Sequence, residues 1–235
     1  LLKKKLLDQG VKFILLVTDG SHSENETSTY QLFPSYQMSK FLGSFLNLVV
    51  KEKELGLIIK SKKPGYLSSL GKIKNLLLEA KKTKRFYVFD DLGLEPKFFS
   101  KIVDFTIGTS VDFPSSVIQL AIYGSKCIIY DFSNFKISES SLYSWGENKV
   151  IFNDLDLMLK KFKDFMKNKN LNISLGDWSK KIYTYDMFCD NRGGERIEEY
   201  IESLKNGFDK GKSAEECLNY ANKYYENKWG KDKIL

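Results

Sequence analysis

The chain has 235 residues, 42% of them hydrophobic, which is enough to bury the core of one large α/β domain or two small ones. It carries 37 Lys and Arg residues against 30 Asp and Glu residues, and the resulting charge of +7 is spread along the chain. Because there is no arginine-rich run, zinc-finger spacing or aromatic ribonucleoprotein motif, we expect no nucleic-acid partner. The diffuse charge indicates a solvated surface, or attraction to an anionic ligand or membrane surface.

The cysteine and hydropathy patterns both predict a cytoplasmic protein. Three widely spaced cysteines form neither a disulfide framework nor a metal-binding pair. No apolar run approaches the roughly 20 residues that a membrane-spanning helix needs, and the first residues are too few and too charged for a signal peptide. The chain does not begin with Met, so we expect a fragment or a processed form.

Six short apolar runs predict β-strands after a short opening helix. They lie at residues 11–18, 55–60, 85–90, 104–107, 127–130 and 149–152. The segments between them predict helices at residues 36–51, 67–82, 95–100 and 115–123. Strands that alternate with helices form right-handed βαβ units and a parallel sheet. The fold class predicted for residues 1–153 is therefore α/β, a Rossmann-like doubly wound parallel sheet.

Residues 154–235 are predicted to form a helical C-terminal extension. We predict helices at residues 155–167, 192–205 and 213–225, and a capping box of Ser213 and Glu216 opens the last of them. No repeat and no low-complexity linker separates this part from the sheet domain. We therefore expect the extension to pack on that domain.

The stretch of residues 101–131 is the centre of the functional interpretation. It reads as strand, polar turn, helix and strand, and Gly108, Thr109 and Ser110 form the turn. A strand that enters a helix through small polar residues presents free N–H groups and hydroxyls at the carboxyl edge of the sheet. Phosphates are commonly bound at such an edge.

Other predicted strand ends, and the start of the helix at residue 115, add polar side chains to this edge. They supply Asp19, Lys60, Lys62, Asp91, Ser115, Ser116 and Asp131. Lysine ammonium groups would pair with phosphate charge and the serines would donate hydrogen bonds, so the edge suits a nucleotide diphosphate. In the plainer interpretation, the serines are polar residues of a first helical turn and the lysines form a solvated turn.

Several common functional motifs are incomplete in this sequence or lie in the wrong structural context. Residues 211–213 read Gly-Lys-Ser, but Gly207 is at the wrong spacing for a P-loop and no strand precedes it. The dinucleotide-binding GxGxxG pattern is absent, which argues against a nicotinamide dehydrogenase. Residues 154–156 match the Asp-x-Asp motif of metal-dependent glycosyltransferases, but their position between strand and helix favours a helix N-cap. We expect neither a metal nor a bound cofactor.

His22 is the only histidine, and it follows the first predicted strand in a polar loop. A His-rich metal site is therefore excluded, and a Ser-His-Asp triad would have to use this residue. His22 is the one candidate catalytic residue, as a general base or a phosphate donor, and the alternative is an ordinary solvated loop residue.

Six stretches in chain order form a combined pattern: LIIKSK at residues 57–62, VDFTIGTS at 103–110, CIIYD at 127–131, LGDW at 175–178, DMFCD at 186–190 and RIEEY at 196–200. Together they resemble the donor-binding domain of GT-B glycosyltransferases. The likeness is to enzymes of bacterial surface and capsule polysaccharide biosynthesis and to the related CDP-glycerol glycerophosphotransferases. The resemblance covers most of the chain.

This resemblance implies metal-independent transfer of a sugar from a nucleotide-activated donor to a glycan or lipid-linked acceptor, near the inner face of the membrane. By matched position, Lys60 and Lys62 would meet the phosphates. Gly108, Thr109, Ser110, Ser115 and Ser116 would line the diphosphate, and Asp131 would border the sugar or ribose. Asp19, Asp91, Asp190 and Arg196 would support the cleft.

One departure from the GT-B pattern keeps other functions open. Such enzymes have a second Rossmann domain, usually N-terminal, which binds the acceptor, and 235 residues leave no room for it. We expect either that this domain lies outside the present chain or that the chain alone is not a complete catalyst. The alternatives are a sugar-nucleotide epimerase of the same fold and a non-catalytic nucleotide- or glycan-binding module of a polysaccharide assembly complex.

Overall fold

The structure is a computed structural model that describes residues 1–18, 35–61, 64–91, 93–109, 115–132 and 141–230. The chain divides into two compact units, Leu1–Lys180 and Lys181–Leu235 (unit 1 and unit 2). Within the described residues, no helix is both long and apolar enough to cross a membrane.

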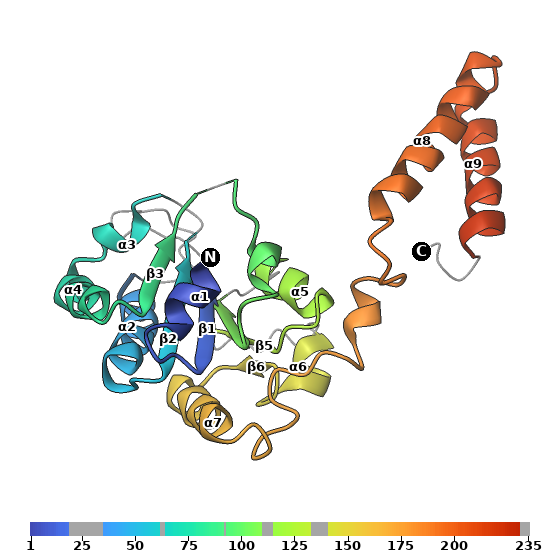
Figure 1. Cartoon of the computed structure of the whole chain (residues 1–235). Helices are drawn as coiled ribbons and strands as arrows, with labels where there is room; N and C mark the ends of the chain where they lie inside the picture. The colour runs from blue at the N-terminus through green and yellow to red at the C-terminus, as the bar shows by residue number, and fades with distance from the viewer. Residues whose placement is uncertain (19–34, 62–63, 92, 110–114, 133–140, 231–235) are drawn as a thin grey trace. The chain divides into compact units, whose positions relative to one another are not determined.

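Unit 1 is built on a parallel sheet, to which the described residues contribute six strands. They are β1 (Phe13–Thr18), β2 (Leu55–Lys60), β3 (Phe86–Phe89), β4 (Phe105–Thr109), β5 (Cys127–Tyr130) and β6 (Ile151–Phe152). All neighbours are parallel, in the order β3-β2-β1-β4-β5-β6 (Figure 1). The predicted α/β class with a doubly wound parallel sheet is therefore confirmed. Since the order reverses between β1 and β4, the topological switch point of the sheet lies there.

Helices cover both faces of this sheet. Those of unit 1 are α1 (Leu2–Leu7), α2 (Ser35–Lys51), α3 (Tyr66–Ser69), η1 (Gly71–Ile73), α4 (Lys74–Lys82), η2 (Pro96–Phe99), α5 (Ser115–Ile122), α6 (Ser141–Gly146) and α7 (Leu155–Lys167). Leu15 and Leu57 point to the face that carries α2, α4 and α7. Gly56 and Gly108 lie on the other face, against α1 and α5 respectively. The central strands β1 and β2 are thereby buried on both sides, which is why their sequences are almost continuously apolar.

Two local predictions for unit 1 differ from the structure. The single helix expected over residues 67–82 is instead three short pieces, because Leu70 adopts φ −81° and ψ 83° and ends α3. The sequence pattern also missed α6, which has only six residues and ends at Gly146.

The end of unit 1 extends beyond the boundary expected at residue 153. Helix α7 buries Phe162 and Phe165 against Phe13 and Phe105, so it belongs to the core of the sheet unit. Further on, the backbone amide of Cys127 at the start of β5 donates to the Gly176 carbonyl over 2.9 Å. The chain therefore divides after Lys180 rather than after residue 153.

Unit 2 consists of η3 (Ile182–Thr184) and two helices, α8 (Gly193–Asp209) and α9 (Ala214–Trp229), that pack side by side (Figure 1). A Cβ on Gly207 would lie 2.6 Å from Cys217 Sγ, so this glycine permits the close approach of the two helices. The predicted capping box of Ser213 and Glu216 opens α9 and is confirmed.

Candidate functional site

The switch point between β1 and β4 brings three small residues together at the carboxyl edge of the sheet. The register places Thr18 beside Lys60 of β2 on one side and Gly108 of β4 on the other. The Ser116 hydroxyl, in the first turn of α5, donates to Thr18 Oγ1 over 3.3 Å. A Cβ on Gly108 would lie 2.3 Å from Val117 Cγ2 and 2.7 Å from Thr18 Oγ1. Gly108 is therefore the residue that lets α5 approach the ends of β1 and β4.

Thr109, the last residue of β4, has a buried hydroxyl. Thr109 is only 7% exposed, and its Oγ1 atom has no hydrogen-bond partner among the described residues. A buried hydroxyl normally has a partner, because leaving it unpaired costs about 1–3 kcal/mol. Thr109 thus offers an unused hydrogen-bonding group at the end of β4, where the sequence predicted a ligand.

Lys60 also lies at this edge, but its ammonium group is engaged. The Lys60 Nζ donates to the carbonyls of Ser61 and Asp91, both over 2.9 Å. The Asp91 carboxylate accepts from the Gly93 amide over 2.8 Å. Lys60 therefore joins the end of β2 to the segment after β3, and one of its three N–H groups has no partner among the described residues and could meet a ligand.

Asp131 follows β5 and is 3% exposed. The Tyr143 hydroxyl of α6 donates to Asp131 Oδ2, and burial together with this hydrogen bond raises the pKa of Tyr143. The pKa of Tyr130 is also raised, first by burial and then by the carboxylates of Asp154 and Asp156. Both phenols stay protonated at neutral pH, so they can donate hydrogen bonds but cannot act as bases.

Asp154 is a helix N-cap, as the sequence favoured. Its Oδ1 accepts from the amides of Asp156 and Leu157 over 2.8 and 2.9 Å. In the part of the chain that the structure describes, no group of three or more His, Cys, Asp or Glu residues could hold a metal ion.

A cavity of about 360 Å³ lies beside the outer strand β3, with Ser61, Gly65 and Asp90 at its polar end. Its apolar wall comes from α3, α4 and β3, including Leu67 and Leu77. Because β2 separates β3 from β1, this cavity is not part of the switch-point site.

Four of the predicted site residues lie outside the described residues: Asp19, His22, Lys62 and Ser110. Among the others, Lys60, Gly108, Thr109, Ser116 and Asp131 all lie at the carboxyl edge of the sheet. Ser115 is the exposed first residue of α5.

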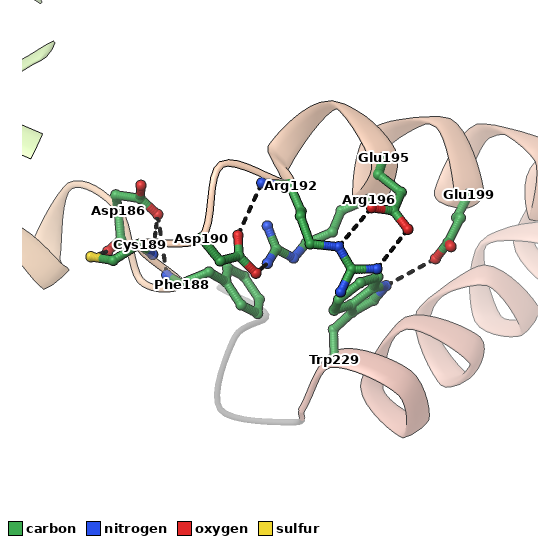
Figure 2. Close-up of polar contacts among 9 residues, drawn as sticks. All are labelled: Asp186, Phe188, Cys189, Asp190, Arg192, Glu195, Arg196, Glu199 and Trp229. Atoms are coloured by element: carbon green, nitrogen blue, oxygen red, sulfur yellow. Dashed lines mark hydrogen bonds and ion pairs between the residues drawn. The ribbon is translucent and has the colours of Figure 1, made fainter. Parts of the chain in front are cut away.

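Asp190 and Arg196 belong to unit 2, where they bind each other. Asp190 accepts from Arg196 Nη2, and its other oxygen accepts from the Arg192 amide over 3.0 Å (Figure 2). The guanidinium of Arg196 lies over the Phe188 ring at 3.4 Å and over the Trp229 ring at 4.6 Å. The two residues thus hold the turn before α8 against the end of α9.

Thr18 and Tyr143 are the site residues that the sequence analysis missed. Thr18 had a usable signal, since it is the one hydroxyl at the end of an otherwise apolar strand. Tyr143 had none, because its contact with Asp131 depends on a helix that the pattern did not predict.

Compared with family models, curated proteins and solved structures, the chain matches none of them. The geometry of the sheet edge therefore carries the functional argument alone.

Proposed function

We propose that the carboxyl edge of unit 1 binds the diphosphate of a nucleotide-activated sugar. On this proposal the chain is the donor-binding part of a metal-independent GT-B glycosyltransferase that acts on cell-surface polysaccharide. The observation that carries the proposal is the unpartnered buried hydroxyl of Thr109 beside the switch point of a sheet with the order β3-β2-β1-β4-β5-β6. Open α/β sheets bind ligands at this place.

The charges around the edge favour one orientation of the donor. After burial, the carboxylates of Asp154, Asp156 and Asp131 add to the raised pKa of Tyr130, so the same negative charges would repel a diphosphate next to β5 and β6. The ends of β1 and β4 instead offer hydroxyls, with the remaining N–H of Lys60 nearby. We propose that the diphosphate lies there and that the sugar hydroxyls approach Asp131.

The proposed mechanism is electrostatic. As the bond between the sugar and the diphosphate breaks, negative charge grows on the leaving phosphate oxygens. Donors at this edge, such as the hydroxyl of Thr109, the hydroxyl of Thr18 that Ser116 holds in place, and the ammonium of Lys60, would stabilise that charge. The base that activates the acceptor is not assigned to any described residue.

Isothermal titration calorimetry with UDP-, GDP- and CDP-linked sugars tests the proposal. We expect one nucleotide to bind and Ser116→Ala to weaken it about tenfold, the effect of one good hydrogen bond. Ser125→Ala is the matched control, since Ser125 precedes β5 at the opposite edge of the sheet and should leave binding unchanged. Binding by none of these ligands would reject the proposal.

A second measurement separates an enzyme from a binding module. Release of free nucleotide diphosphate from the bound donor in the presence of glycan acceptors would support transfer. Binding that depends on Ser116 but never leads to release would instead identify a non-catalytic nucleotide-sugar-binding module.

A further inference from the structure

One face of α8 carries an apolar stripe that the described residues do not cover. Ile197, Ile201 and Phe208 are 63%, 57% and 55% exposed, and Leu204 between them is half-buried. These four residues (the α8 stripe) follow one another at steps of four, three and four. That spacing is the a/d pattern of a helix that pairs with another helix along its length.

Helix α9 packs on a different face of α8. The buried residues of α8 are Arg196, Ser203 and Gly207, and Gly207 is the one that contacts Cys217 of α9. At about 100° per residue, these three residues lie roughly a quarter-turn or more from the centre of the α8 stripe. The contact with α9 therefore leaves the stripe open to a second helix.

Two opposite charges border the stripe on the side away from α9. Glu198 and Lys205 are both exposed, at the positions that follow Ile197 and Leu204. They are e positions of the heptad pattern, and in an antiparallel helix pair the e positions of the two helices meet. The midpoint between Glu198 and Lys205 coincides with the midpoint of the stripe to within one residue.

We infer that α8 pairs in an antiparallel manner with α8 of a second copy of this chain. A two-fold axis between Glu202 and Ser203 places Ile201 opposite Leu204 of the second copy and Ile197 opposite its Phe208. It also brings Glu198 next to Lys205 of the second copy, twice in each dimer. This surface is independent of the proposed nucleotide-sugar site.

The occupant is a second copy because the stripe is complementary to itself. The four-three-four spacing of the stripe is the same in both directions along α8. Reversing the direction of the helix exchanges the acidic residue beside the stripe, Glu198, for the basic one, Lys205. A partner with a different sequence would not require this symmetry. The stripe is roughly 17 Å long at 1.5 Å per residue, so we expect a concentration-dependent dimer.

Sedimentation velocity of the full chain over a concentration series is the first test. We expect dimerisation that is weakened at least about tenfold by Ile201→Lys, which places a charge in the centre of the contact. Asn206→Lys introduces the same residue on the opposite side of α8 and should leave dimerisation unchanged. A wild-type chain that stays monomeric up to roughly 0.1 mM, or equal weakening by the two variants, overturns the inference.

Charge reversal tests the antiparallel register without touching the apolar contact. Glu198→Lys alone and Lys205→Glu alone should each weaken the dimer several-fold, because each leaves like charges side by side in both symmetric pairs. The double variant exchanges the signs and should restore association. Circular dichroism confirms that each variant keeps its helices. Failure of the double variant to recover association overturns the proposed register.

Discussion

Arg85 is a buried cation that holds the end of α2 to the start of β3. Its guanidinium donates to the carbonyls of Glu52 and Leu55, both over 2.6 Å, and to that of Val49 over 2.8 Å. The carbonyls of Val49 and Glu52 lie at the end of α2, where no helical partner is available, and Leu55 is the first residue of β2. Burial lowers the pKa of Arg85, but the guanidinium stays charged at neutral pH.

Arg85→Ala should therefore destabilise unit 1 by about 3 kcal/mol, because three buried carbonyls lose a charged donor. Urea unfolding measures the loss as a lower transition midpoint. Lys82→Ala is the matched control, since Lys82 is an exposed cation three residues away and should change the free energy of unfolding by less than about 0.5 kcal/mol. An effect of Arg85→Ala as small as that of the control would contradict this role.

Thr109→Val separates a ligand-binding role from a structural one. Without ligand, replacing an unpaired buried hydroxyl by a methyl group should leave the free energy of unfolding unchanged or raise it by about 1 kcal/mol. If the hydroxyl binds the diphosphate, the same change should weaken the nucleotide sugar about tenfold. Thermal unfolding and calorimetry measure the two effects, and a variant that loses stability without ligand would refute the reading of Thr109 as an unpaired group.

At the scale of single residues, the sequence predicted what depends on near neighbours in the chain. The N-cap at Asp154 and the capping box of Ser213 and Glu216 involve residues two or three positions apart. The engagement of Lys60 by the Asp91 carbonyl joins residues 31 positions apart, and no local pattern encodes it. For the same reason the sequence treated Lys60 as a free phosphate ligand.

Helix α5 sits close to β4 because Gly108 has no side chain. Gly108→Ala would put a methyl group 2.3 Å from Val117 Cγ2, so α5 must move away from the strand. We expect a loss of about 2–3 kcal/mol in the free energy of unfolding, measured in urea, together with weaker nucleotide binding. Gly194→Ala is the control, since nothing lies within 4 Å of its added carbon and alanine favours the helix.

A double variant tests whether the clash is the cause. Val117→Ala removes the atom that the new methyl group would strike, so the double variant Gly108→Ala/Val117→Ala should lose about 1–2 kcal/mol less than the sum of the single losses. Strictly additive losses would contradict the proposed contact between β4 and α5.

Among the helices and strands, the predicted bounds were most accurate where the apolar pattern continues along the whole element. Strand β2 has the predicted bounds, and α2 and α7 were found within one residue of theirs. The segment of residues 67–82 failed because its apolar spacing continues through Leu70, whose backbone leaves the helical region. The spacing of apolar residues indicates which side chains are buried. One long helix and three short ones can produce the same spacing, so the spacing does not distinguish them.

For the whole molecule, the sequence predicted parallel strands but not their order. Alternating strands and helices imply parallel pairing. The pairing of β1 with β4, however, joins segments that are about 90 residues apart in the chain, so no local pattern predicts it. The division after Lys180 was hidden for a similar reason. Trp178 Nε1 donates to the Cys127 carbonyl over 2.7 Å and the Cys127 amide donates to the Gly176 carbonyl over 2.9 Å, and such distant contacts show that the segment after α7 belongs to unit 1.

Unit 2 has little apolar core of its own, since every residue of the main hydrophobic cluster belongs to unit 1. Polar and cation–π contacts join the start of α8 to the end of α9. The hydrogen bond from Arg196, followed by the one from the Arg192 amide, lowers the pKa of Asp190. A carboxylate whose pKa is lower in the folded state stabilises the fold above its unfolded pKa, and this contribution is lost as the pH falls through the folded value.

Acid should therefore destabilise unit 2 partly through Asp190, over a pH range that begins at the unfolded Asp pKa of about 3.9 and extends below it. Asp190→Asn should lower the urea midpoint of unit 2 at neutral pH, because the ion pair with Arg196 is lost, and should lessen the further decline of this midpoint in acid.

Pulse labelling of α8 and α9 amides at one fixed pH, after equilibration in urea at each test pH, measures unit 2 separately from unit 1. Asp209→Asn is the control, because Asp209 has no ion pair among the described residues and should retain the wild-type response. If Asp190→Asn and the wild-type chain lose the same stability between neutral and acidic pH, the ion pair of Asp190 with Arg196 does not stabilise unit 2.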